Sequence, residues 1–223
     1  MKKLVIVGCG RLAGIVSDAV VNGLLPEYDL VGVYSRTAEK AGRIVAKMQQ
    51  HGKTCMACTT IEDLLALKPD YLVEAASPAA MKELALPALK NGTSIVTLSI
   101  GALADTAFYQ EVIETAQANG TRVYIVSGAT GGFDVLRTAS LMGNATAKFF
   151  NEKGPDALKG TAVYDEALQT EQRIVFSGNA TEAIAMFPTK VNVAVAASLA
   201  SVGPENMQMS MQSTPGFVGD TQR

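Results

Sequence analysis

The sequence predicts an α/β protein with a doubly wound, parallel Rossmann sheet, followed by a second, smaller α+β domain. Three observations lead to this prediction. Short apolar runs alternate with helical patterns over residues 1–127, glycines follow the first apolar run, and the alternation stops near Ser127. Strands that alternate with helices form parallel sheets with helices on both faces. We therefore expect two domains, over residues 1–127 and 128–223.

The first domain contains the regular part of the pattern. We expect strands at 4–7, 30–34, 53–57, 71–75, 94–98 and 122–126, with helices at 12–24, 37–50, from Thr60, at 78–91 and at 105–118. Thr37 is a candidate N-cap, and Asn91-Gly92 is a typical helix end. In the first helix we expect one buried stripe, formed by Leu12, Ile15, Val16, Ala19, Val20 and Leu24.

The second domain is less regular. Gly128, Gly131 and Gly132 predict a loop before a helix at 133–142, and further helices are expected at 180–186 and 192–201. Strands are expected around Val163, at 174–176 and at 207–212. The last of these alternates methionine with polar residues, which is typical of a strand with one exposed face. We interpret the methionines as core, and the open sheet suggests a homodimer.

Composition excludes several classes of function. The 223 residues include 19 Lys+Arg, 21 Asp+Glu and one histidine, so the net charge of −2 does not favour nucleic-acid binding. No stretch approaches the about 20 apolar residues of a membrane span. The apolar run that begins the chain is too short for a secretion signal. We expect a cytoplasmic protein without a metal site, in which any histidine chemistry would depend on His51.

The cysteines fit a reducing compartment. There are three, Cys9, Cys55 and Cys58, an odd number that argues against a disulfide framework. Cys55 and Cys58 form a CxxC pair, which could be redox-active or half of a zinc site. No second CxxC or nearby histidine completes a metal site, and we interpret the pair as structural.

The glycines after the first strand match a dinucleotide-binding motif. Gly8-Cys9-Gly10-Arg11-Leu12-Ala13 has the G-x-G-x-x-G/A pattern, with Gly14 just beyond. The first glycine permits a tight turn, and the second lets a pyrophosphate approach the backbone at the helix N-terminus. The position between a strand and a helix is the context that the motif requires. We predict that Gly8, Gly10, Arg11 and Leu12 contact a dinucleotide cofactor bound by the first domain.

The residues after the second and fourth strands refine this prediction. NAD-specific sites usually carry an acidic residue about 20 positions beyond the motif, but this chain has Ser35 and Arg36. A hydroxyl and a guanidinium suit a 2′-phosphate, so NADP is preferred and NAD remains possible. Alternatively, Arg36 stacks on adenine in a site that accepts both. Ala76 and Ser77 are small residues where the nicotinamide half would pass, and Glu74 before them is either a paired structural carboxylate or a catalytic group.

Three segments make a family resemblance specific: Val73 to Pro78, Ser127 to Leu136 and Phe187 to Ala194. Through them the chain resembles the L-aspartate dehydrogenase family, which is similar in fold to homoserine dehydrogenases. The family interconverts aspartate and iminoaspartate with NAD or NADP. The resemblance implies that Ala129 and Asn192 contact the cofactor near the nicotinamide, and that Lys153 occupies a lysine position of the family. An alternative role for Asn192 is helix capping.

Two departures qualify the resemblance. The family's catalytic histidine lies in an Asn-x-His segment, and alignment through Pro215 places Asp220 and Gln222 there instead. The family pattern also continues beyond Arg223, so we expect the second domain to be incomplete at its C-terminus or the histidine role to be lost. A glutamine amide cannot carry a proton near neutral pH.

The resulting prediction is an NAD(P)-dependent oxidoreductase that acts on a small acidic amino acid. Lys153 and Gln222 are its weak catalytic candidates. The second domain would bind the substrate and form the dimer. The alternative is a non-catalytic or weakly active NADP-binding protein that lacks the family histidine.

Overall fold

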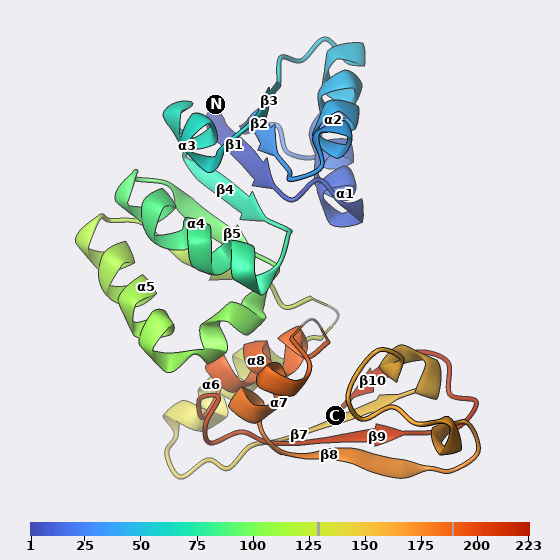
Figure 1. The fold of residues 1–223 in the computed structure, drawn as a ribbon. Coiled ribbons are helices and arrows are strands. Elements are labelled where there is room, and N and C mark those ends of the chain that lie inside the picture. The colour runs from blue at the N-terminus through green and yellow to red at the C-terminus, as the bar shows by residue number, and fades with distance from the viewer. Residues whose placement is uncertain (129, 189) are drawn as a thin grey trace. The chain divides into compact units, whose positions relative to one another are not determined.

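The computed structural model describes residues 1–128, 130–188 and 190–223 (Figure 1). It contains two compact units. Unit 1 comprises Met1–Ala102 and Thr106–Val126, and unit 2 comprises Leu103–Asp105 and Ser127–Arg223. Within the described residues, no helix is both long enough and apolar enough for a membrane span.

Unit 1 is built on a six-stranded sheet in the order β3-β2-β1-β4-β5-β6, in which all neighbouring strands pair in parallel. This is the doubly wound sheet that the alternation predicted. The strands are β1 (Lys2–Val7), β2 (Tyr28–Tyr34), β3 (Met56–Cys58), β4 (Tyr71–Glu74), β5 (Ser94–Thr97) and β6 (Val123–Ile125). The helices are α1 (Arg11–Val21), α2 (Ala38–Gln50), α3 (Ile61–Ala66), α4 (Pro78–Lys90) and α5 (Thr106–Ala118), with a 3-10 segment η1 (Ile100–Ala104).

Helices cover both faces of this sheet. Val33 in β2 shares a buried cluster with residues of α1 and α2. The neighbouring Gly32 meets Leu64 of α3 and Leu67 just after it. Successive strand residues point to opposite faces, so α3 lies on the face that α1 and α2 do not cover. The apolar strands are therefore buried from both sides, as a parallel sheet requires.

The predicted stripe of α1 is only partly right: Val20 is buried, and Val16 and Ala19 are half-buried. The helix buries Ala13, Ser17 and Val20, whereas Leu12 and Ile15 are 48% and 56% exposed. Positions 13, 17 and 20 follow the i, i+4, i+7 spacing of one helix face. This face carries small residues because α1 packs close to the sheet directly after the glycine turn. Leu24 lies beyond the helix and is also exposed.

Unit 2 contains a four-stranded mixed sheet in the order β10-β7-β9-β8. The strands are β7 (Lys148–Lys153), β8 (Arg173–Asn179), β9 (Gln208–Ser213) and β10 (Asp220–Gln222). The helices are α6 (Phe133–Leu141), α7 (Ala180–Met186) and α8 (Asn192–Leu199), with 3-10 segments η2 (Pro155–Leu158) and η3 (Glu166–Gln169). This matches the expected smaller α+β part, although the predicted strand at Val163 is wrong because Val163 lies in a turn.

The methionine pattern of β9 was interpreted correctly as core, but the methionine face is not open. Met209 and Met211 are buried in a cluster with Phe149, Phe176 and residues of α7 and α8. Gln208, Ser210 and Gln212 alternate with them and are exposed or half-buried. The open face of this sheet is therefore the polar one.

Candidate functional sites

The turn after β1 places Gly8 against the turn after β4. Gly8 has φ +91°, and its N–H donates to the Tyr34 carbonyl at 2.9 Å. A Cβ at this position would lie 2.6 Å from the carbonyl carbon and oxygen of Ala75. Glycine is thus required here both by backbone conformation and by the close approach of β4.

Gly10 has a different role. It is the N-cap residue of α1, with φ −86°, and a Cβ built on it meets no atom within 4 Å. The space beside it belongs to a cavity of about 270 Å³. The first N–H groups of α1 have no partners within the helix, so this end attracts an anion. Arg11 and Leu12 are exposed in the same turn and do not line the cavity.

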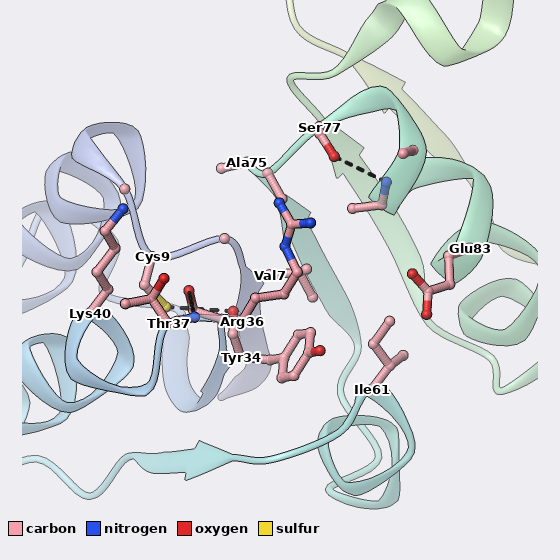
Figure 2. A pocket seen from close by; sticks show the side chains of 16 residues that line it. Val7, Cys9, Tyr34, Arg36, Thr37, Lys40, Ile61, Ala75, Ser77 and Glu83 are labelled. Carbon is pink, nitrogen blue, oxygen red and sulfur yellow. Dashed lines mark hydrogen bonds between the residues drawn. The ribbon is translucent and has the colours of Figure 1, made fainter.

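The cavity extends from the glycine turn across the ends of β2 and β4 (Figure 2). Its position at the carboxyl ends of parallel strands is where ligands bind in such sheets. Of the predicted cofactor residues of unit 1, the structure brings together Gly8, Gly10, Ser35, Arg36, Ala76 and Ser77. The sequence prediction did not include Thr37, Lys40, Ile61 and Glu83, which also line it.

The end of β2 presents polar groups to this cavity. Ser35 Oγ accepts a hydrogen bond from the Thr37 N–H at 3.2 Å. Thr37 is the N-cap residue of α2, as predicted, but its side chain makes no capping hydrogen bond. The Arg36 side chain extends toward the Ser77 side of the cavity (Figure 2). Residues 35–37, which directly follow β2, are Ser-Arg-Thr and include no carboxylate.

Glu74 is a structural carboxylate. It is fully buried at the end of β4, and both of its oxygens accept hydrogen bonds. Oε1 accepts from the N–H groups of Ala76 and Ser77, at 2.8 and 3.1 Å, and from Ser99 Oγ at 2.9 Å. Oε2 accepts from Thr97 Oγ1 at 2.8 Å and from the Ser99 N–H at 3.0 Å. Through these bonds Glu74 holds the turn with Ala76 and Ser77, which line the cavity, whereas Glu74 itself is not among the lining residues.

These features fit a dinucleotide cofactor. The open space at Gly10 leaves the backbone accessible to a pyrophosphate, and α1 directs its N-terminus at that point. Small side chains at Ala76 and Ser77 leave room along the wall. A side chain at Gly10 would fill this space.

The cysteines do not form a redox pair. All three thiols are free; Cys55 directly precedes the extended strand β3, and Cys58 is its last residue. Residues three apart in an extended strand have Cα atoms about 10 Å apart, beyond the roughly 7 Å that a disulfide tolerates. Burial raises the pKa of Cys9 to about 11 and, aided by Cys58 and Cys9, the pKa of Cys55 to about 12. The structural interpretation of the CxxC pair is therefore supported.

In unit 2, a polar cluster lies on the covered face of the sheet. Lys153 is only 5% exposed, and its ammonium forms an ion pair with the Asp220 carboxylate. Asn151, 3% exposed, donates to the other oxygen of Asp220 and, at 3.1 Å, to the Thr221 carbonyl. Strand pairing produces this arrangement, because Lys153 lies opposite Asp220 and Asn151 opposite Gln222. Sequence reasoning named Lys153 and Gln222 but missed Asn151, because neither β7 nor β10 was predicted.

The remaining residues that the sequence analysis singled out lie in several different parts of the chain. Gln222 Oε1 accepts a hydrogen bond from Thr130 Oγ1 at 3.0 Å. Asn192 is the first residue of α8 and follows the N-cap residue Val191. Ala129 lies outside the described residues. His51 is exposed at the end of α2, with Nδ1 2.9 Å from the Lys47 carbonyl oxygen.

Two family models match separate parts of the chain. Residues 8–126 match the family model described as homoserine dehydrogenase, NAD binding domain. Residues 134–223 match the model described as aspartate dehydrogenase, C-terminal. The fold, the glycine turn and these matches define an NAD(P)-dependent oxidoreductase.

Similarity to individual proteins shows the family to which the chain belongs. The chain is 30% identical over 213 residues to the L-aspartate dehydrogenase of Methanococcus maripaludis strain C6, covering 94% of this chain and 78% of the relative. It is 32% identical over 209 residues to that of Methanocaldococcus jannaschii, covering 92% and 76%. The chain belongs to the aspartate dehydrogenase family, which confirms the resemblance. The crystal structure of aspartate dehydrogenase from Thermotoga maritima has the same fold, with a TM-score of 0.75 at 23% identity over 100% of this chain and 83% of that one.

Proposed function

We propose that this protein is an NADP-preferring dehydrogenase that interconverts L-aspartate and iminoaspartate. The observation that carries the proposal is the presence, in one chain of this family, of a dinucleotide cavity at Gly10 and a buried ammonium at Lys153. The cofactor, when bound, supplies or accepts the hydride. The substrate carries two carboxylates, and a buried cation suits one of them.

In the first domain, residues 1–127, the protein holds the cofactor by its backbone and by the end of β2. The N-terminus of α1 binds the pyrophosphate, with Gly8, Gly10, Arg11 and Leu12 forming the turn. Ser35 and Arg36 bind the 2′-phosphate of NADP. Ala76 and Ser77 border the nicotinamide half, and Ala129 and Asn192, on the evidence of family membership, contact it as well.

In the second domain, residues 128–223, Lys153 binds a substrate carboxylate. Its neutralising partner Asp220 has a side chain that is 45% exposed, which leaves the ion pair open to exchange with a charged ligand. Asn151 fixes the orientation of Asp220, and Gln222 is available to hydrogen-bond the substrate nitrogen or a water molecule. Each of these roles requires only binding and orientation.

Cofactor preference is tested by titrating NADP(H) and NAD(H), by fluorescence or calorimetry. We expect tighter binding of NADP(H). Arg36→Ala should cost about 1.5–3 kcal/mol, roughly ten- to a hundredfold in NADP affinity. Ser35→Asp should also weaken NADP, because a carboxylate repels the phosphate. Equal affinities in the parent, unchanged in Arg36→Ala, would contradict the preference for NADP.

The activity is tested by following NADPH oxidation with oxaloacetate and ammonia. Oxaloacetate alone is the control, because its reduction as a keto acid would mimic activity without using ammonia. Ammonia-dependent oxidation that yields L-aspartate supports the proposal. Dependence on another keto acid would place the chain in the same class with a different substrate.

A second function is favoured by one observation. Gln222 occupies the position aligned with the family histidine, and His51 is exposed at the end of α2. Without a side chain that carries a proton at the substrate, the chain would be a non-catalytic or weakly active NADP-binding protein. Cofactor binding without turnover in both directions would support this alternative.

The protein is further proposed to be a cytoplasmic homodimer. The free thiols Cys9, Cys55 and Cys58 suit a reducing compartment. The open face of the second sheet includes Phe150 and the 50% exposed Ile174, and is available to a second copy. Sedimentation of the parent beside an Ile174→Lys variant tests this: a monomeric parent contradicts the dimer.

A further inference from the structure

The two ends of the cofactor cavity differ in charge. Lys40, in the first turn of α2, lies on the same side of the cavity as Cys9 in the glycine turn (Figure 2). Glu83 of α4 lies at the other end, beside Ile61. A group that carries two negative charges is therefore attracted to the Lys40 end and repelled from the Glu83 end.

Lys40 is available for a ligand. Within the described ranges, its ammonium forms no ion pair or side-chain hydrogen bond. Lys47 on the same helix is committed instead, because its ammonium contacts Asp18 Oδ1 at 2.7 Å and Ser17 Oγ at 3.2 Å. Arg43 is exposed and does not line the cavity. Lys40 is thus the cation that α2 presents to the cavity.

Lys40 and Arg36 stand on either side of Thr37 (Figure 2). Between them is the short turn in which Ser35 Oγ accepts from the Thr37 N–H. The Thr37 side chain makes no capping hydrogen bond, so its hydroxyl is not used by the helix. The positive end of the 13-residue α2 adds to the field at this turn. The arrangement combines two cations, hydroxyl groups and a helix N-terminus around one point of the cavity rim.

We propose that Lys40 is a specificity-determining residue that binds the 2′-phosphate of NADP from the side opposite Arg36. The inference rests on the proposed NADP preference and deepens it. Arg36 extends toward Ser77 across the cavity (Figure 2), so in this proposal it contacts the adenine as well as the phosphate. Lys40 touches only the phosphate, so its contribution is absent when the 2′-position carries a hydroxyl.

The experiment uses two fragments that differ only in that phosphate. Adenosine 2′,5′-bisphosphate and adenosine 5′-monophosphate are titrated by calorimetry into the full chain and into Lys40→Ala, Arg36→Ala and Arg43→Ala. We expect Lys40→Ala to lower the affinity for the bisphosphate at least tenfold and to leave the monophosphate affinity unchanged. Arg36→Ala should weaken both, through the lost adenine contact. Arg43→Ala, the matched cation outside the cavity, should weaken neither.

The outcomes separate the two proposals. Suppose that the parent binds the bisphosphate more tightly than the monophosphate and that Lys40→Ala has the same ratio of affinities. Lys40 then does not bind the phosphate, although the NADP preference stands. If the parent binds both fragments equally, the NADP preference and the role of Lys40 both fail. Lys40→Arg, which keeps the charge, should retain most of the difference, whereas a purely structural role would not depend on charge. Thermal unfolding of each variant verifies that the fold is intact.

Discussion

Thr130 donates its hydroxyl hydrogen to the side-chain carbonyl of Gln222, with 3.0 Å between Thr130 Oγ1 and Gln222 Oε1. The bond joins the segment after Ser127 to the edge strand β10. It also holds the side chain of Gln222, the residue that our proposal aligns with the family's catalytic histidine. The Gln222 amide can orient a substrate by hydrogen bonding, but it cannot act as a general acid or base.

Turnover should therefore respond to a single substitution. Gln222→His introduces an acid–base group, which typically contributes about 10²–10⁴-fold to a rate. We expect ammonia-dependent NADPH oxidation to be weak in the parent and to rise at least tenfold in kcat in Gln222→His, with NADPH affinity unchanged. Thr130→Val is the control, because it removes the hydrogen bond without adding a base. Robust parental activity that Gln222→Ala does not reduce would show that the catalytic group lies elsewhere.

Substitutions at the two motif glycines should have different effects, on cofactor binding at Gly10 and on stability at Gly8. Gly10→Val places a side chain where nothing else lies within 4 Å, so the thermal midpoint should stay near that of the parent while NADPH binding is lost. Gly8→Ala forces a Cβ to within 2.6 Å of Ala75 at a φ of +91°, and should destabilise the fold by a few kcal/mol. Thermal unfolding and NADPH fluorescence distinguish the two effects. Parental NADPH affinity in Gly10→Val would mean that this turn is not the cofactor site.

Substitution of Lys153 should weaken substrate binding more than cofactor binding. Lys153→Met removes the buried ammonium, and we expect the KM for oxaloacetate to rise at least tenfold while NADPH affinity is unchanged. The loss of stability should be about 1 kcal/mol, because Asp220 remains half exposed to water. Lys159→Met, which breaks an exposed pair with Asp156, is the matched control and should alter neither. An unchanged KM in Lys153→Met would remove Lys153 from the substrate site.

The thiols should differ in reactivity. Because burial raises the pKa of Cys9 to about 11 and of Cys55 to about 12, both stay protonated at pH 8. Ellman's reagent should modify half-buried Cys58 first and the other two only on unfolding. Because burial penalises the thiolate only in the folded state, the free energy of unfolding should be unaffected by these thiols below about pH 9 and should fall as the pH rises from 9 toward 11–12. Cys58→Ser should abolish the early reaction, and rapid labelling of Cys9 in that variant would contradict the assignment.

The first sheet was predictable because its signals are local. Each strand is an apolar run of a few residues, and each is followed by a helix whose beginning or end carries a recognisable residue, such as Ser77 or Thr60. The side chains of Ser77 and Thr60 accept capping hydrogen bonds from the N–H groups of Ala80 and Asp63. The face of α1 was not predictable from hydrophobicity, because close packing after the glycine turn selects the small Ala13 over the larger Leu12.

The second site was only partly predictable because it depends on pairing across the sequence. Lys153 and Asp220 are 67 residues apart, and their meeting depends on β7 and β10 lying side by side. β10 has three residues, and β7 has the mixed sequence KFFNEK, so neither shows a clear period. The family resemblance named Lys153 and Gln222 as candidates, but only the antiparallel register shows that Asn151 lies opposite Gln222 and next to Asp220.

Glu74 couples the turn after β4, which lines the cofactor cavity, to the turn after β5. One carboxylate accepts from the amides of Ala76 and Ser77 after β4 and from the amide of Ser99 after β5. Neither turn can leave its place without breaking hydrogen bonds to a buried carboxyl group that the other turn still holds. The amides of these two segments should therefore exchange with deuterium at one common rate, and Glu74→Gln should raise both rates together. Because both turns are bonded to the same carboxyl group, local unfolding should open the two turns together rather than one at a time.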